Sequence, residues 1–122
     1  MKFEKIDCGN GSMVAVSSED MVITGVDSAL DLLMSARYEA DTTYLIVDKK
    51  NIVEDFFILS SGLAGEILQK FINSGAKIAI YGDFSHYTSK PLQDFIYESN
   101  KGRDVFFVAT KEEAIEKMSQ NI

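Results

Sequence analysis

The fold class is decided by the stretch Tyr44-Leu45-Ile46-Val47-Asp48. A short apolar, β-prone run that stops at an aspartate is typical of a strand buried on both faces. The pattern returns in Ile78–Tyr81, which leads into Gly82-Asp83, and again in Val105–Val108. Strands of this kind are covered by helices on both faces of a parallel sheet, so the sequence predicts an α/β protein.

Helical patterns occupy the intervals between these strands. After Asp27, which we expect to cap a helix, apolar spacing of 3.6 residues predicts a buried stripe made of Ala29, Leu30, Leu33, Met34 and Arg37. A second stripe, Leu63–Ile72, ends at Ser74-Gly75, a helix stop signal. Pro91 fits the first turn of a third helix. Thr110 and Glu113 match a capping box that opens a fourth.

The N-terminal part adds a hairpin to this alternation. Phe3–Asp7 and Met13–Val16 read as two strands joined by Gly9-Asn10-Gly11-Ser12, a turn sequence that tolerates positive φ. The expected order is therefore ββαβαβαβα, with one mixed, mostly parallel sheet and flanking helices. Because 122 residues is an ordinary domain size, residues 1–122 are predicted to form one domain.

Composition narrows the classes of partner. Hydrophobic residues make up 46% and charged residues 25% of the chain, which is ordinary for a globular domain. The formal net charge of −7 disfavours nucleic acids and anionic membranes as partners. Cys8 is the only cysteine, so an internal disulfide and a cysteine-based zinc site are excluded. No signal peptide or membrane-spanning run is present, and we expect a cytoplasmic protein without a cofactor.

Two aspartates mark the expected binding edge. Asp48 and Asp83 each follow a predicted buried strand, and the carboxyl ends of parallel strands meet at the edge where ligands usually bind. Together with Glu54 and Asp55 they could hold a divalent cation through oxygen ligands. The alternative, solvated loop acids or helix caps, is favoured, because no known metal-ligand spacing is present. No metal site is predicted.

A serine pair precedes the second helix. Ser60, Ser61 and Gly62 stand directly before its apolar stripe, so a serine there is expected to cap free N–H groups. The same geometry could bind a phosphate or accommodate a phosphoserine, because a helix N-terminus attracts anions.

A polar loop precedes the third helix. Residues 82–91 concentrate hydrogen-bond donors, including Ser85, His86, Tyr87 and Lys90. Such a loop could bind a partner protein or a small anion, or simply connect two elements. We expect sulfate or phosphate to bind weakly near Ser60, Ser61 and Lys90.

Complete catalytic and nucleotide-binding motifs are absent from the sequence. His86 is the only histidine, and no Gly-x-Ser-x-Gly elbow, Gly-x-Gly-x-x-Gly motif or P-loop occurs. A non-enzymatic role is therefore favoured, without a catalytic residue being assigned. The alternative is a small-molecule-binding protein or small hydrolytic enzyme that uses Asp48, Asp83, Ser60 and Lys90.

Several long sequence segments resemble those of an uncharacterised bacterial family, domain of unknown function 4180. They are Val53–Phe57, Ser61–Phe71, Gly82–Ser85 and Phe95–Gly102. This resemblance implies no established activity.

A more remote resemblance is to the STAS domains of anti-sigma-factor antagonists. Leu59-Ser60-Ser61-Gly62-Leu63 is similar to their Asp-Ser-Ser-Gly-Leu motif, and the closing strand and helix are also similar. The family's aspartate is replaced by Leu59. The resemblance implies a regulatory, protein-interaction domain in which Ser60 matches a serine phosphorylated by a partner kinase. Its working face would comprise Ser60, Ser61 and the loop Ser85–Lys90.

Overall fold

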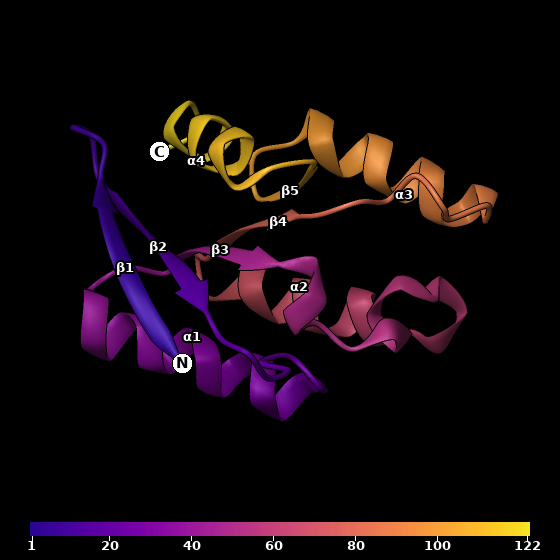
Figure 1. The fold of residues 1–122 in the computed structure, drawn as a ribbon, viewed down its shortest axis with the longest axis horizontal. Helices are drawn as coiled ribbons and strands as arrows, with labels where there is room; N and C mark the ends of the chain where they lie inside the picture. Colours follow the sequence, from indigo (N-terminus) through magenta and orange to yellow (C-terminus); the bar gives the residue numbers. More distant parts are fainter.

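The computed structural model describes residues 1–122 and confirms an α/β architecture (Figure 1). The elements follow the predicted order ββαβαβαβα. They are β1 (Lys2–Asp7), β2 (Ser12–Ser17), α1 (Val26–Ala40), β3 (Tyr44–Asp48), α2 (Leu63–Asn73), β4 (Lys77–Tyr81), α3 (Lys90–Lys101), β5 (Val105–Val108) and α4 (Lys111–Ser119).

All five strands form one sheet with the spatial order β1-β2-β3-β4-β5. The hairpin strands β1 and β2 pair antiparallel, and every other neighbouring pair is parallel. The prediction of a mixed, mostly parallel sheet is confirmed. In the register, Asp48 at the end of β3 lies opposite Tyr81 at the end of β4, which aligns the two carboxyl ends.

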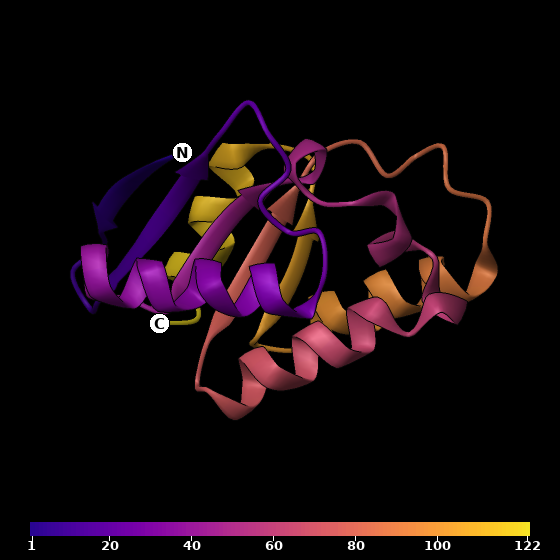
Figure 2. The same ribbon diagram turned by 90° about the horizontal axis from the view of Figure 1, so that it is seen from below.

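Helices cover the two faces of the sheet unequally. The crossover helices α1, α2 and α3 pack on one face in a core of 23 buried residues, and α4 packs on the other in a core of seven. Figures 1 and 2 show α1 and α2 along one side of the sheet and α4 on the opposite side. Crossovers of constant hand that step in one direction across a sheet place their helices on the same face, which explains this arrangement.

The first helix differs in detail from the prediction. Its N-cap is Gly25 rather than Asp27, and the Ser28 hydroxyl accepts hydrogen bonds from the N–H groups of Thr24 and Gly25. Met34 is 57% exposed, because the stripe that faces the sheet is shifted by one position. That stripe consists of Ala29, Leu32, Leu33, Ala36 and Ala40.

The connection from β3 to α2, for which the sequence shows no helix or strand pattern, is built from three short 3₁₀ turns: η1 (Lys49–Asn51), η2 (Glu54–Phe57) and η3 (Leu59–Ser61). Phe56 and Phe57 are buried and anchor the segment to the core. A buried Asn51 donates hydrogen bonds to the carbonyls of Ser18 and Asp20, at 2.9 and 2.8 Å. The connection is therefore a packed part of the structure.

No helix is both long enough and apolar enough to cross a lipid bilayer.

Candidate functional site

Two hollows lie at the carboxyl end of the sheet. The first, called the groove, has a volume of about 830 Å³ and lies between the η2–η3 segment and the loop before α3. Its lining is Glu54, Phe57, Ile58, Leu59, Ser60, His86, Tyr87, Thr88, Ser89 and Pro91. The second, called the β5 cleft, has about 690 Å³. Its lining is Gly82, Asp83, Phe84, Ser85, Ile96, Asn100, Phe107, Val108, Ala109 and Glu113.

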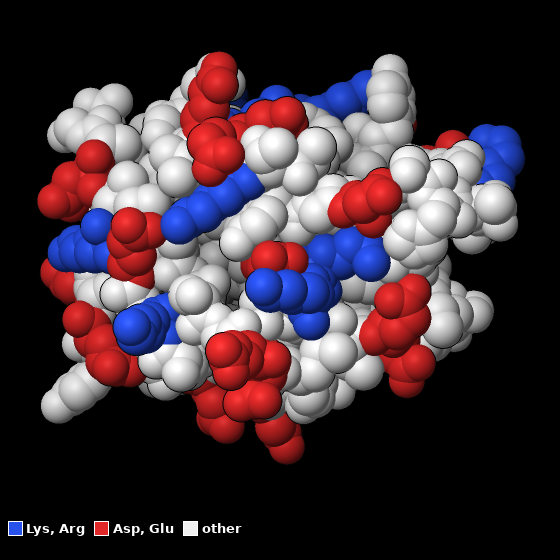
Figure 3. Space-filling model, viewed as in Figure 1, with Lys and Arg blue, Asp and Glu red and all other residues white.

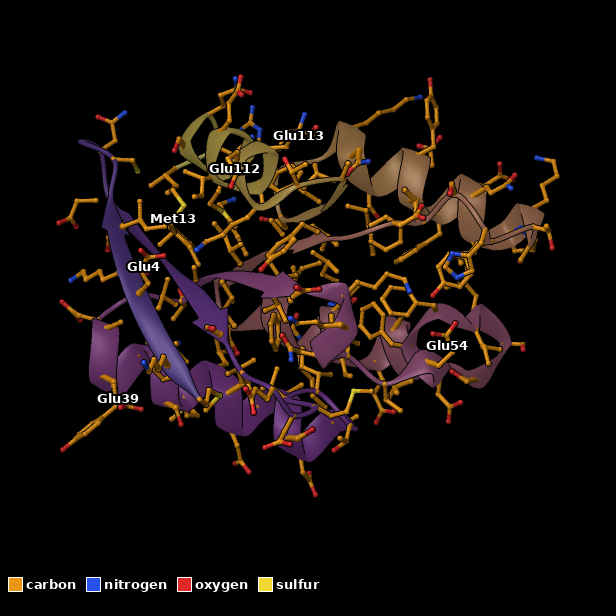
Figure 4. All side chains as sticks on the ribbon, in the orientation of Figure 1. Glu4, Met13, Glu39, Glu54, Glu112 and Glu113 are labelled. Carbon is orange, nitrogen blue, oxygen red and sulfur yellow. The ribbon has the colours of Figure 1, made fainter.

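The groove lies where α2 and α3 begin, at the end of the molecule marked by Glu54 in Figure 4. Its two walls come from segments about 30 residues apart in the sequence. Stacked aromatic rings join them. The Phe57 and Tyr87 rings are 5.6 Å apart at an interplanar angle of 24°, and Phe84 contacts both. Because Phe57 is buried in the core, the loop that carries Tyr87 is held against the folded domain.

A lysine directly after β3, at the start of η1, supports these rings. The ammonium of Lys49 lies 5.0 Å from the Tyr87 ring centroid and 5.4 Å from that of Phe57, within cation–π range. Its aliphatic stem crosses Gly82, where an added Cβ would lie 2.6 Å from the Lys49 Cβ. Gly82 is therefore required for the close approach of these two strand ends.

A hydrogen bond spans the groove. The Tyr87 hydroxyl donates to Glu54 Oε1 at 2.9 Å. Partial burial and this carboxylate, which disfavours a second negative charge, raise the pKa of Tyr87 well above its ordinary value. The phenol therefore stays protonated and remains a donor at physiological pH.

The remaining polar side chains of the groove are of two kinds. Ser89 caps α3, accepting from the Leu92 N–H at 3.4 Å. The side chains of Ser60, His86 and Thr88 make no hydrogen bond within the protein, and all three residues are exposed. These three groups are free to bind a ligand.

The β5 cleft has a different polar lining. Asp83 accepts from the Ser85 N–H and hydroxyl at 2.8 and 2.6 Å, and these bonds lower its pKa. Asn100 pairs with both backbone groups of Phe107: its amide donates to the carbonyl at 3.0 Å, and its oxygen accepts from the N–H at 2.7 Å. Glu113 accepts from the Ala109 N–H at 3.4 Å. The polar side chains of the β5 cleft thus stabilise their own loops and strand edge.

The residues predicted to form one site lie in different places in the structure. Ser60 and Tyr87 line the groove, whereas Asp83 and Ser85 line the β5 cleft. The N-cap of α2 is Gly62 rather than a serine, and Ser61, one residue before it, donates its hydroxyl to the Asp55 carbonyl and accepts from the Leu63 N–H. Gly62 has φ +78° and supplies the left-handed turn between η3 and α2.

Asp48 and Lys90 lie outside both hollows. Asp48 accepts from the Lys50 N–H at 2.9 Å and caps η1, which corresponds to the helix-cap alternative. The Lys90 ammonium binds the Asp94 carboxylate at 2.8 Å on the exposed surface of α3. Neither side chain lies with Ser60 in one site.

Charge is dispersed over the surface. On the face in Figure 3, basic and acidic side chains are interspersed, with acids gathered along the lower margin, which lies over α1. No group of three or more His, Cys, Asp and Glu side chains has a geometry that could hold a metal ion.

Sequence reasoning missed two residues of this region. The position of Lys49 depends on the rings of Phe57 and Tyr87, which only the folded chain brings to it. Ile58, which is 47% exposed and lines the groove, lies in the connection between β3 and α2, where no helix or strand pattern marks it. The available signal was the apolar run Phe56-Phe57-Ile58-Leu59, which is unusual for a solvated connection.

Comparison with protein-family models places residues 9–118 in one family, described as Domain of unknown function (DUF4180). The chain belongs to this family. In this DUF4180 domain the match includes both walls of the groove and the whole β5 cleft. No curated protein and no solved structure matches the chain.

Proposed function

We propose that this DUF4180 domain is a non-enzymatic interaction domain that binds a segment of a partner protein in the groove. The observation that carries the proposal is the set of free polar side chains, Ser60, His86 and Thr88, around an apolar surface made by Ile58 and Pro91. Protein-binding surfaces combine such apolar anchors with hydrogen-bonding groups that are free to pair with the partner.

The chemistry of the groove also supports binding over catalysis. Nucleophilic catalysis by serine needs a base within hydrogen-bond reach and a third group that orients the base. Ser60 and His86 make no hydrogen bond to each other or to any other side chain. Ser61, the other serine of the pair, uses its hydroxyl in two structural hydrogen bonds to the backbone of Asp55 and Leu63.

A regulatory role extends this proposal. Ser60 is exposed in the wall of the groove, and it matches the serine that is phosphorylated in STAS antagonists. A phosphate there would add about two negative charges to the binding surface at neutral pH. Phosphorylation of Ser60 by a cytoplasmic partner kinase would then control which segment binds.

The alternative of an anion-binding protein or hydrolytic enzyme is less well supported. A volume of about 830 Å³ lies within the range of small-molecule sites. However, of Asp48, Asp83, Ser60 and Lys90, only Ser60 lines the groove, and Lys90 is paired with Asp94. An anion would meet the carboxylate of Glu54 without a lysine or arginine in the lining.

Affinity capture with matched variants tests the proposal. Ile58→Ser removes an apolar anchor from the groove, and Ile72→Ser removes a side chain of similar exposure (44% against 47%) from α2, outside the groove. We expect Ile58→Ser and Ser60→Glu to lose a partner that wild type and Ile72→Ser both retain. Identical partners for all four proteins would contradict the proposal.

A further inference from the structure

The charge that lines the groove is negative. Among its ten lining residues Glu54 is the only formally charged one when His86 is neutral, and no lysine or arginine contributes to the lining. The whole chain carries a formal net charge of −7, which adds a long-range attraction for positively charged partners. The groove therefore presents a negative group in an electrically negative protein.

Glu54 retains binding capacity in this position. Its Oε1 accepts from the Tyr87 hydroxyl, whereas Oε2 has no hydrogen-bond or ion-pair partner in the protein. The carboxylate is thus oriented by one bond and open at the other oxygen. A guanidinium is suited to such a group, because its planar set of N–H donors binds carboxylates with defined geometry.

Nearby cations do not satisfy Glu54. Lys49 lies over the rings of Phe57 and Tyr87 without an ion pair to any acid, and Lys90 pairs with Asp94. Apolar side chains from Ile58, Leu59 and Pro91 flank the same hollow. They can cover the aliphatic stem of a long basic side chain and its apolar neighbours.

We infer that the groove selects a partner segment that carries an arginine, whose guanidinium pairs with Glu54 while adjacent apolar residues contact Ile58 and Pro91. This inference rests on the proposed function and names the chemistry of the partner. An exposed ion pair of this kind contributes modestly, so the expected discrimination is about 2–5-fold in Kd.

The test is an NMR titration with three blocked peptides of the form acetyl-Pro-Leu-X-Leu-Pro-amide. X is arginine, its neutral isostere citrulline, or glutamate. We expect the arginine peptide to shift groove amides, including those of Ser60 and Thr88, with a Kd about 2–5-fold below that of the citrulline peptide. The glutamate peptide should bind most weakly. Raising the salt concentration should reduce the difference between arginine and citrulline.

Two variants distinguish the effect of the Glu54 charge from that of a neighbouring charge. Glu54→Gln keeps an acceptor for the Tyr87 hydroxyl and removes the charge, so arginine and citrulline peptides should bind it equally. Asp55→Asn removes the same charge from the adjacent residue, which does not line the groove, and should retain discrimination.

Equal binding of the arginine and citrulline peptides to wild type would overturn the inference and leave the groove as an interaction site. Binding of neither peptide would also overturn it, while the proposed function would still be judged by the capture experiment with Ile58→Ser. Amide shifts confined to the β5 cleft would contradict both the inference about arginine and the proposed function.

Discussion

The groove and the β5 cleft are hollows of similar size at the same end of the sheet, and they differ in how their polar side chains are used. In the β5 cleft Asp83, Asn100 and Glu113 all bind backbone groups of nearby loops or of the β5 edge. In the groove the side chains of Ser60, His86 and Thr88 have no intramolecular hydrogen-bond partner. Hydrogen bonds made internally stabilise the fold, whereas unpaired groups on the surface remain open to a ligand. The two hollows differ in these hydrogen bonds and hardly in volume.

The largest expected effect comes from the residue that the groove shares with the core. Phe57 is 3% exposed and stacks on Tyr87, so Phe57→Ala should lower the free energy of unfolding by about 3–5 kcal/mol. Urea denaturation measures this loss. The half-buried Phe84, replaced by alanine in the same way, should cost less. A loss below about 1 kcal/mol for Phe57→Ala would mean that the groove wall is not anchored by the core.

The second prediction compares one polar side chain from each hollow. Asn100→Ala leaves both backbone groups of Phe107 without their hydrogen-bond partner, which should lower the free energy of unfolding by about 1–3 kcal/mol. The higher helix propensity of alanine offsets about 0.5 kcal/mol of this loss. Ser60→Ala removes a hydroxyl that makes no internal bond and should change stability by less than about 0.5 kcal/mol. Denaturation of both variants checks the pair. Equal losses would remove the distinction between the two hollows.

The third prediction concerns the hydrogen bond across the groove. Tyr87→Phe removes the bond to Glu54 and should cost about 1 kcal/mol at pH 7. The folded pKa of Tyr87 is raised above the unfolded value of 10.0, so its stabilisation is complete below pH 10 and is lost as pH rises through the folded pKa. The stability difference between wild type and Tyr87→Phe should therefore shrink in alkaline solution. A difference that is constant from pH 8 upward would contradict this assignment.

The smallest expected effect is at Asp83. Because the bonds from Ser85 lower the folded pKa below the unfolded value of 3.8, the stabilisation is present above that value and is lost as pH falls through the folded pKa. Wild type should be more stable than Asp83→Asn at pH 7, with the difference disappearing in acid. Asp55→Asn, at an exposed acid whose side chain makes no hydrogen bond, is the control. Identical pH profiles for Asp83→Asn and wild type would show that the turn does not use the carboxylate.

Local sequence pointed to two residues of the groove lining and to the loop before α3, but not to how the other residues group. Ser60 and Tyr87 were expected at one working face, and both line the groove. Lys90 was expected beside them, yet its ammonium binds Asp94 one helical turn away. A side chain at a helix start can turn toward the site or along its own helix, and sequence spacing does not decide between these directions.

By itself, the sequence determined the order of elements, the parallel sheet and the carboxyl edge. These follow from the period of apolar residues and from turn chemistry, which act over a few positions. Only the tertiary structure decided that the connection after β3 packs as 3₁₀ turns, that Lys49 and Tyr87 meet over Phe57, and that Glu54 keeps one oxygen free. Those outcomes depend on contacts between residues about 30 or more positions apart. The packing of two distant segments against the same buried ring sets such contacts, and no local pattern encodes them.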